Sequence, residues 1–311
     1  MLLDSFRKPK LPRSLLYFQY LQGRMLFSPH YSRQYEIMKN GYIGEKKFYE
    51  KMIYLLPENS FNLYSLNLSH RNAAFQLDSI LFFQNKLIHF EIKYYKGDYV
   101  LHDDNWFAAK SKQEINNPLI QLRRASSFLR QVVKEIGWRG EVEGRLVFMH
   151  ASFYLYGARY GDPVIFLPQV EREIGQIVAN HSGPMAPEKQ LAETLVARHE
   201  EVSRYEQPPA YDYNALWKGL NCGNCFEGRL VRESERLFCC SKCLTKIGQE
   251  EALIYNIRQF VFLFDKRKLR TGVIYEWCGG IVSKFIIGRI LKKYYHSFGS
   301  GKSTYYLGEK E

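Results

Sequence analysis

The spacing of apolar residues in the first half of the chain predicts a mixture of helices and strands. Apolar positions recur at helical spacing over residues 35–56, and Pro118 opens a second helical pattern that continues to Val133. Strand-like runs lie between and after these two patterns. The runs cover residues 61–68, 73–83, 86–95, 146–150 and 164–167. The first half is therefore expected to belong to the α/β class.

The ends and the second half of the chain follow other patterns. Residues 1–30 are basic, contain Pro9 and Pro12, and predict a tail or an irregular first helix. Residues 168 to about 215 are polar and interrupted by prolines, with one helical pattern over 188–200, and predict a connecting segment or an extension of the first domain. Two cysteine pairs follow, and a helical pattern over 249–264 comes after them.

Composition narrows the class of protein. The 311 residues suffice for two or three modules, and the hydrophobic content of 46% is high enough for a packed core. The net charge of +12 favours an anionic partner, with nucleic acid ahead of an acidic membrane surface. The alternative is a basic surface that only keeps the protein in solution.

Neither a secretory signal nor a membrane span is visible. The N-terminal residues lack an apolar core and a small-residue cleavage site. No run reaches the roughly 18 apolar residues of a membrane span, and the nearest, 253–264, contains Arg258. We therefore expect a cytoplasmic protein that does not enter a membrane. Its six cysteines should be thiols or metal ligands rather than disulfides.

The segment 75–97 contains three charged residues in an apolar setting. Strand alternation places Glu91 and Lys93 on one face of the second of two strands. A two-residue turn at Gln84-Asn85 would pair Asp78 with Glu91. A turn at Asn85-Lys86 would instead pair Asp78 with Lys93, and a three-residue turn would move the groups to opposite faces.

Asp78, Glu91 and Lys93 together suit phosphodiester cleavage. Two carboxylates in an apolar strand repel each other, but they become favourable around a hard divalent cation such as Mg²⁺ or Mn²⁺. A neighbouring lysine can stabilise the negative charge of a phosphoryl transition state. The alternative is a solvated hairpin face with a salt bridge, which the apolar neighbours on both sides of Glu91 disfavour.

Residues 35 to about 150 resemble the nuclease-related (NERD) domain of the restriction-endonuclease-like superfamily. The resemblance rests on four stretches in the family's order: G-Y-I-G-E at 41–45, Q-L-D-S-I at 76–80, F-E-I-K-Y-Y-K-G at 90–97 and N-P-L-I-Q at 117–121. It implies a restriction-endonuclease-like fold, with a central mixed sheet flanked by helices.

The resemblance also implies a role for each matching residue. Those residues are Glu45 as an outer carboxylate on the first helix, Asp78 and Glu91 as metal ligands, Lys93 as the catalytic lysine and Gln121 as an active-site residue on a helix. One position departs from the family, which commonly has an acidic residue where this chain has Gln76. Alternatively, Gly41 and Gly44 serve a turn or close packing, Glu45 is a first-turn carboxylate that the helix dipole favours, and Gln121 is an ordinary polar helix residue.

The cysteine pairs predict a structural zinc site. C-G-N-C at 222–225 and C-S-K-C at 240–243 are separated by 14 residues whose ends look like strands, as in a zinc ribbon. Cys222, Cys225, Cys240 and Cys243 would fill all four tetrahedral positions, so that the zinc is structural. Cys239 is a rival of Cys240 with poorer spacing.

The C-terminal residues predict a winged helix-turn-helix. Thr271 is a plausible N-cap of one helix, Gly279-Gly280 forms a turn, and Ser283 caps a second helix. The stretch F-G-S-G-K-S-T-Y-Y-L then suits a β-hairpin wing, and it lacks the first glycine of a phosphate-binding loop. The residues expected to contact nucleic acid are Lys284, Arg289, Lys292, Lys293 and Lys302. The alternative is a small helical bundle used for dimer contacts.

These expectations combine into a modular protein that acts on DNA, with double-stranded DNA as the expected partner. The segments are a basic tail at 1–30, a nuclease-related domain at 31–167, a helical linker at 168–218, a zinc ribbon at 219–247 and a winged-helix-like domain at 248–311. The expected function is Mg²⁺-dependent or Mn²⁺-dependent cleavage. The two alternatives are a non-catalytic DNA-binding regulator and a zinc-stabilised protein-interaction module.

Overall fold

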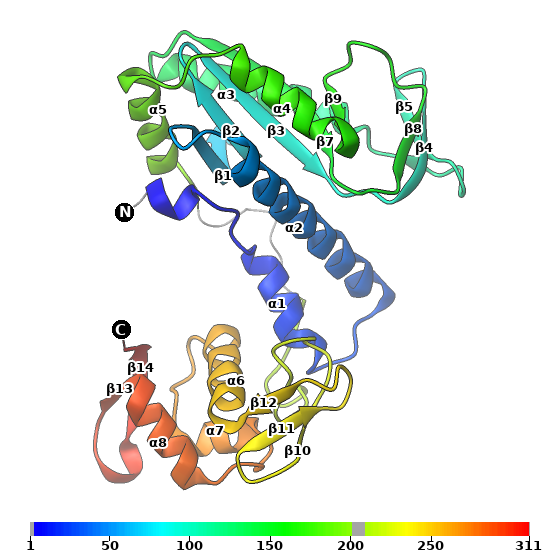
Figure 1. The fold of residues 1–311 in the computed structure, drawn as a ribbon. Coiled ribbons are helices and arrows are strands. Elements are labelled where there is room, and N and C mark those ends of the chain that lie inside the picture. The colour runs from blue at the N-terminus through cyan, green and yellow to red at the C-terminus, as the bar shows by residue number, and fades with distance from the viewer. Residues whose placement is uncertain (1–2, 201–208, 311) are drawn as a thin grey trace. The chain divides into compact units, whose positions relative to one another are not determined.

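The computed structural model describes residues 3–200 and 209–310 and divides the chain into two compact units (Figure 1). The first unit comprises Met1–Pro12 and Glu36–Glu206, and the second comprises Arg13–Tyr35 and Gln207–Glu311. Within the described part of the chain, no helix combines the length and the apolar character that crossing a membrane requires.

A five-stranded mixed sheet forms the centre of the first unit. Its strands, in spatial order, are β1 (Phe61–His70), β2 (Ala73–Phe83), β3 (Lys86–Lys93), β7 (Glu141–Phe148) and β9 (Val164–Phe166). The first three strands run antiparallel, whereas β7 is parallel to both β3 and β9. The mixed sheet flanked by helices that the sequence predicts is thus confirmed, and it is consistent with a nuclease-like fold.

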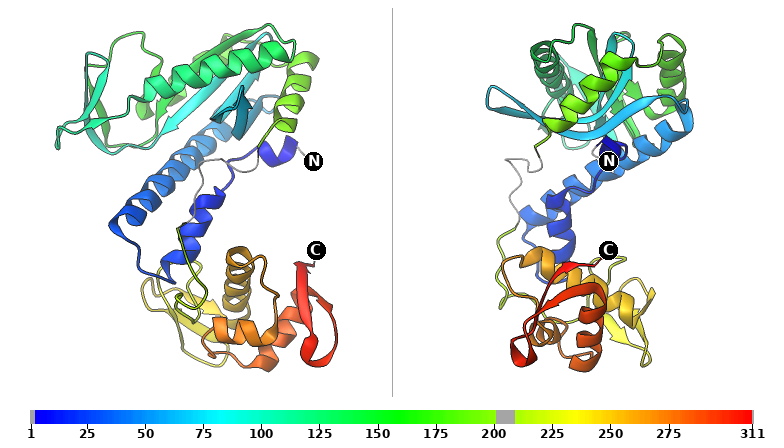
Figure 2. Two further views of the ribbon diagram at one scale, coloured as in Figure 1. Left: turned by 180° about the vertical axis from the view of Figure 1, so that it is seen from behind. Right: turned by 90° about the vertical axis from the view of Figure 1, so that its left-hand side faces the viewer.

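Helices cover both faces of this sheet (Figures 1 and 2). Helices α3 (Pro118–Glu135) and α5 (Ala186–Ala197) bury one face, in a core that includes Leu77, Leu87 and Leu129. Helices α2 (Pro29–Leu55), from Glu36 onward, and α4 (Val170–Ala179) bury the other. Helix α3 begins where the sequence predicts, because the Asn117 side chain caps it and Pro118 occupies its first turn. The short 3₁₀ helices of this unit are η1 (Leu3–Phe6) and η2 (Leu167–Gln169).

A second, four-stranded sheet lies beside the end of the first, and the sequence patterns do not predict it. Its strands, in spatial order, are β6 (Glu114–Ile115), β5 (Asn105–Ala108), β4 (Gly97–His102) and β8 (Phe153–Tyr156). They are short, and their turn residues Asp103 and Asp104 have positive φ angles of 47° and 65°. Fully buried Trp106 packs this sheet against the first turns of α3.

The second unit joins a small cysteine-bearing sheet to a group of helices. The sheet contains β10 (Leu230–Arg232), β11 (Leu237–Cys240) and β12 (Lys246–Gly248). The helices are α1 (Arg13–Gln22), α6 (Gln249–Leu263), α7 (Thr271–Trp277) and α8 (Lys284–Tyr294). A hairpin of β13 (Tyr295–Phe298) and β14 (Tyr305–Glu309), with η3 (Gly301–Ser303) at its tip, completes the unit.

The connection between α7 and α8 follows the expected pattern except at one cap. Gly279 and Gly280 both have positive φ angles, of 66° and 69°, and so reverse the chain. The Ser283 hydroxyl accepts a hydrogen bond from the backbone N–H of Ile286 and caps α8 as predicted. Thr271, by contrast, is the first residue of α7, and the preceding Arg270 occupies the N-cap without a side-chain hydrogen bond.

Residues 1–30, for which the sequence leaves a basic tail or an irregular first helix open, contain the helix α1. Residues Leu15, Phe18 and Leu21 of α1 are fully buried, and the helix packs against α6. Their spacing of three residues forms an apolar stripe on one helix face, which the charge and prolines around it obscure in the sequence. Burial of this stripe makes residues 13–22 part of the second unit's core.

Arg24 forms hydrogen bonds with uncharged oxygen atoms inside this core. Its guanidinium is fully buried, donates to the side chains of Gln259 and Asn256, and lies 3.8 Å from the ring centroid of Trp277. It also donates to the backbone carbonyls of Trp217, Gly219 and Trp277. A single side chain thus satisfies acceptors from several segments that are far apart in the sequence.

Replacing Arg24 by methionine should destabilise the second unit by about 3 kcal/mol or more, since methionine leaves several buried acceptors without donors. Urea unfolding followed by tryptophan fluorescence would measure the change. The matched control is Arg33→Met on an exposed position of α2, which should change the free energy of unfolding by less than about 0.5 kcal/mol. Equal stability of the two variants would contradict this role of Arg24.

Candidate active site and metal centre

The register between β2 and β3 brings the two predicted metal ligands together. Phe83 pairs with Lys86 and Ser79 with Phe90, so the turn is the two-residue one at Gln84-Asn85. One step further along the same register, Asp78 stands opposite Glu91. At this point the Asp78 carboxylate accepts a hydrogen bond of 2.8 Å from the backbone N–H of Ile92. Of the two-residue turns considered from the sequence, the one that pairs the carboxylates is therefore the one that forms.

Lys93 and Gln121 join this pair from β3 and α3. The Nζ atom of Lys93 lies 2.7 Å from Oε1 of Glu91 and donates to Oε1 of Gln121 at 2.8 Å. Glu91 and Lys93 are two residues apart on one strand, so their side chains leave the same face of the sheet. Gln121 reaches them because α3 starts at Pro118 and its first turn lies over that face.

Glu45 reaches the same centre from α2. Its Oε2 atom accepts a hydrogen bond of 3.2 Å from the hydroxyl of Ser65 on β1, a residue that the sequence analysis did not single out. A serine in a predicted strand is an ordinary polar residue, so no signal in the sequence singles out Ser65. Gly44 permits a close approach of α2, because a Cβ atom there would lie 3.0 Å from the Cβ of Tyr94.

All three carboxyl groups are buried, and burial raises their pKa values. The exposed fractions are 9% for Glu45, 8% for Asp78 and 2% for Glu91. Burial, reinforced by the nearby Asp78 carboxylate, raises the pKa of Glu91 to about 7. Burial likewise raises the pKa of Asp78, and burial together with Asp78 raises the pKa of Glu45. These groups hold protons more readily than exposed carboxylates do.

Lys93 remains charged in this setting. Burial alone would lower the pKa of its ammonium group, but the Glu91 and Asp78 carboxylates outweigh that effect and hold the pKa above its usual value. The centre thus combines oxygen donors, which hard divalent cations prefer, with a fixed positive charge. Gln76, the position that departs from the family pattern, is exposed and pairs with Asn67 in the sheet.

The four predicted cysteines form the second candidate centre. Their sulfur atoms all lie within 4.8 Å of one another, which no other group of three or more His, Cys, Asp or Glu residues achieves in the described part of the chain. Two sulfur pairs lie 3.6 and 3.7 Å apart. Tetrahedral zinc with bonds of about 2.3 Å requires sulfur separations of about 3.8 Å. The cluster of Cys222, Cys225, Cys240 and Cys243 could therefore bind zinc, and it fits a zinc ribbon.

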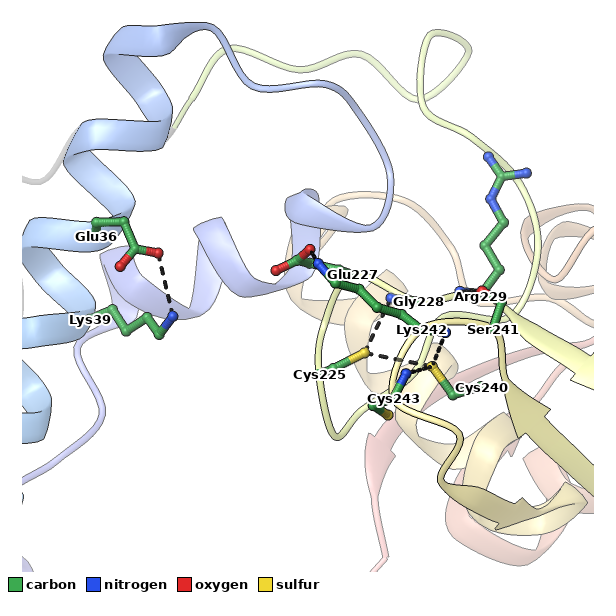
Figure 3. A network of polar contacts seen from close by, with 10 residues as sticks. All are labelled: Glu36, Lys39, Cys225, Glu227, Gly228, Arg229, Cys240, Ser241, Lys242 and Cys243. Atoms are coloured by element: carbon green, nitrogen blue, oxygen red, sulfur yellow. Dashed lines mark hydrogen bonds and ion pairs between the residues drawn. The ribbon is translucent and has the colours of Figure 1, made fainter.

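The backbone around the cysteines is arranged to stabilise thiolates (Figure 3). The N–H of Gly228 donates to Cys225 Sγ at 3.3 Å, and the N–H groups of Lys242 and Cys243 point to Cys240 Sγ at 3.4 and 3.5 Å. Such donors offset the negative charge of metal-bound sulfur. Gly228 is required there for a steric reason as well, since a Cβ atom would lie 2.2 Å from Cys240 Sγ.

The other two cysteines stay outside the cluster. The thiol of Cys239 faces the backbone carbonyls of Cys240 and Leu244. Cys240, not Cys239, is therefore the member of the cluster, as the spacing predicts. Cys278 is fully buried in the hydrophobic core, and burial raises the pKa of its thiol to about 12. None of the six cysteines forms a disulfide.

The predicted nucleic-acid contacts lie on α8 and on the hairpin after it. Lys284, Arg289 and Lys292 are exposed on α8. Lys293 is also exposed, but its ammonium group forms an ion pair of 2.7 Å with Glu250. The side chain of Lys302 lies outside the described residues, although the backbone at the hairpin tip is described.

Comparison with known proteins finds one family match, which lies within the first unit. Residues 40–149 match the family model described as the nuclease-related domain, NERD. Searches among curated proteins and among solved structures found no significant match. The matched residues include Glu45, Asp78, Glu91, Lys93 and Gln121. The chain therefore carries a nuclease-related domain over residues 40–149 and, in its C-terminal part, a four-cysteine cluster that fits a zinc ribbon.

Proposed function

We propose that this protein is a metal-dependent nuclease that cleaves DNA. The observation that carries the proposal is the convergence of Asp78, Glu91 and Lys93 on the adjacent strands β2 and β3 in the mixed sheet of a nuclease-related domain. Buried like-charged carboxyl groups are costly, and a lysine only partly compensates them. A site of this kind is expected to serve chemistry rather than stability.

The proposed mechanism assigns one task to each residue. Asp78 and Glu91 would hold Mg²⁺ or Mn²⁺, which when bound polarises a phosphate and lowers the pKa of a water molecule. Lys93 would place its charge beside the phosphoryl oxygens as negative charge develops on them. Gln121 holds the Lys93 ammonium group in place through its 2.8 Å hydrogen bond. Glu45 would orient a water molecule at the edge of the centre.

The second unit supplies the features expected of a DNA-targeting module. Its α7–turn–α8 segment followed by the β13–β14 hairpin has the order of a winged helix-turn-helix. Exposed Lys284, Arg289 and Lys292 on α8 suit contacts with phosphates, and the four-cysteine cluster would be a structural zinc site. Binding through phosphate contacts should weaken steeply as salt rises.

The test is cleavage of labelled double-stranded DNA, single-stranded DNA and RNA by the full chain with Mg²⁺ or Mn²⁺. The proposal expects cleavage of DNA that chelation stops and added metal restores. Salt-sensitive DNA binding without cleavage, with either metal and every substrate, would favour the non-catalytic regulator instead. Absence of both binding and cleavage would favour a protein-interaction module.

The affinity for Mn²⁺ should rise with pH between 6 and 8. Metal ligands must be deprotonated, and the pKa of Glu91 in the metal-free protein is about 7. Below that pH a proton must leave before the metal binds, so affinity should fall by up to about tenfold per pH unit. Electron paramagnetic resonance of free Mn²⁺ would measure it. Glu91→Gln is the control, since it should bind weakly with a shallower pH dependence, and equal affinity of the wild type at both pH values would contradict the prediction.

A further inference from the structure

Ser65 has a backbone conformation that is unusual for its residue type and its place in a strand. It lies in the middle of β1 with a φ angle of +52°. Positive φ is costly for residues other than glycine, asparagine and aspartate, and it persists only where the surrounding structure enforces it. Other non-glycine residues with positive φ in the first unit, such as Arg71 and Asn72, lie outside the helices and strands.

The alternation of side chains between the two faces of β1 is interrupted at Ser65. Leu63 and Leu66 are three positions apart, yet both contribute to the core beneath α3 and α5. In a regular strand, residues three positions apart point to opposite faces. The neighbouring strand does the same, because Leu77 and Ile80 also share that core. Both β1 and β2 therefore shift their alternation by one residue at the same level.

The interruption of the alternation lies beside the residues of the candidate centre. Tyr64 pairs with Ser79 and Leu66 pairs with Leu77. In this register Ser65 stands opposite Asp78. Asp78 in turn stands opposite Glu91 when the β2–β3 register is extended by one step. Ser65, Asp78 and Glu91 thus form a row across three strands. Two of the three members of this row are the candidate metal ligands.

The hydroxyl of Ser65 faces a further member of the centre. It donates to Oε2 of Glu45 at 3.2 Å, and Glu45 is 9% exposed. The left-handed turn of the backbone at Ser65 and this hydrogen bond occur in one residue. A buried carboxylate on a long side chain needs such a partner to keep a single orientation.

We infer that Ser65 is a positioning residue of the catalytic centre, whose strained backbone aims its hydroxyl at Glu45. The inference rests on the proposed nuclease function and adds a residue to it. The strain at Ser65 is a stability cost retained for the geometry of the centre. Removing the hydroxyl should therefore impair the centre whether the substitution raises or lowers the stability of the fold.

Two substitutions of Ser65 separate these effects. Ser65→Gly removes the hydroxyl and relieves the positive φ, so it should raise the thermal midpoint by about 1–3 °C. Ser65→Ala removes the same hydroxyl but keeps the strain, so it should leave the midpoint unchanged or lower. Both variants should lose about 10-fold to 100-fold in Mn²⁺ affinity or in cleavage rate. The matched control is Arg71→Gly, which relieves a φ of +46° in the turn of the same hairpin and should leave Mn²⁺ binding and cleavage unchanged.

The outcomes separate a failure of the Ser65 inference from a failure of the proposed nuclease function. Loss of Mn²⁺ affinity or of cleavage rate in both Ser65 variants, with a higher thermal midpoint in Ser65→Gly than in Ser65→Ala, supports the positioning role. Wild-type Mn²⁺ affinity and cleavage rate in Ser65→Gly would overturn that role while leaving the nuclease intact. If the wild-type chain itself neither binds Mn²⁺ nor cleaves, the proposed function is wrong and the inference falls with it.

Discussion

Replacing Lys93 by methionine should lower the rate of DNA cleavage by about 10²–10³-fold, the usual effect of removing one group that stabilises transition-state charge. Methionine keeps most of the volume of the side chain but removes the charge 2.7 Å from Glu91. The fold should survive, because the buried carboxyls can take up protons instead of remaining as uncompensated charges. Single-turnover cleavage at saturating Mg²⁺ would measure the chemical step.

The strand offers a matched control for this substitution. Lys86 lies at the other end of β3 and forms ion pairs with Glu141 and Glu143. Lys86→Met removes the same charge from the same strand, far along β3 from Asp78, and should leave the cleavage rate within about twofold of the wild type. Glu91→Gln should resemble Lys93→Met in rate but also weaken Mg²⁺ binding. A Lys93→Met protein that cleaves as fast as Lys86→Met would refute the proposed centre.

Loss of the four-cysteine site should unfold the zinc-ribbon part of the second unit while sparing the first. Structural zinc contributes about 10–16 kcal/mol of apparent binding free energy in small zinc modules, more than a domain's usual stability. Cys222 and Cys240 lie in the same hydrophobic core as Phe238, Ile257 and Trp277, so unfolding of the ribbon should reach α6 and α7.

Two substitutions with one control would test this. Cys240→Ser removes a ligand, and Gly228→Ala places a methyl group 2.2 Å from Cys240 Sγ, so both should reduce bound zinc well below one ion per chain. Cys239→Ser removes the neighbouring thiol that stays outside the cluster and should retain one zinc per chain. Atomic absorption gives the stoichiometry, and amide hydrogen exchange should show lost protection in α6 but not in β3.

Those exchange measurements also decide whether the cluster is structural. Full protection of α6 in a zinc-free Cys240→Ser protein would show that the fold does not need the metal. A zinc content that falls in Cys239→Ser as much as in Cys240→Ser would contradict the assignment of the four ligands. Retention of zinc in Gly228→Ala would instead show that the loop can move to admit the methyl group.

Local patterns in the sequence determined most of the elements that carry the site. The boundaries of β2 and the start of α3 follow from apolar alternation and from a proline at the first helical position, both of which act within a few residues. The two C-x₂-C pairs likewise predict a cluster, because each knuckle is a local structure. The resemblance to the nuclease-related domain rests on short stretches of this kind, and it placed Glu45, Asp78, Glu91, Lys93 and Gln121 in one candidate centre.

The sequence alone left the register of the β2–β3 hairpin open among several turns. The structure settles on the two-residue turn, in which Asn85 adopts a positive φ of 57° that asparagine tolerates better than most residues. That choice puts Asp78 opposite Glu91 rather than Lys93. A shift of one residue would have sent one of these groups to the other face of the sheet.

Contacts between distant segments decided the rest. The four-stranded sheet depends on pairing of β4 with β8, more than fifty residues later, so its short strands carry little pattern of their own. Helix α1 packs against α6, more than two hundred residues later, and Arg24 finds its acceptors on segments some two hundred residues away. Ser65 is the clearest case. Its identity predicts an ordinary strand residue, and its strained backbone and bond to Glu45 exist only because α2, β1 and β2 are packed together.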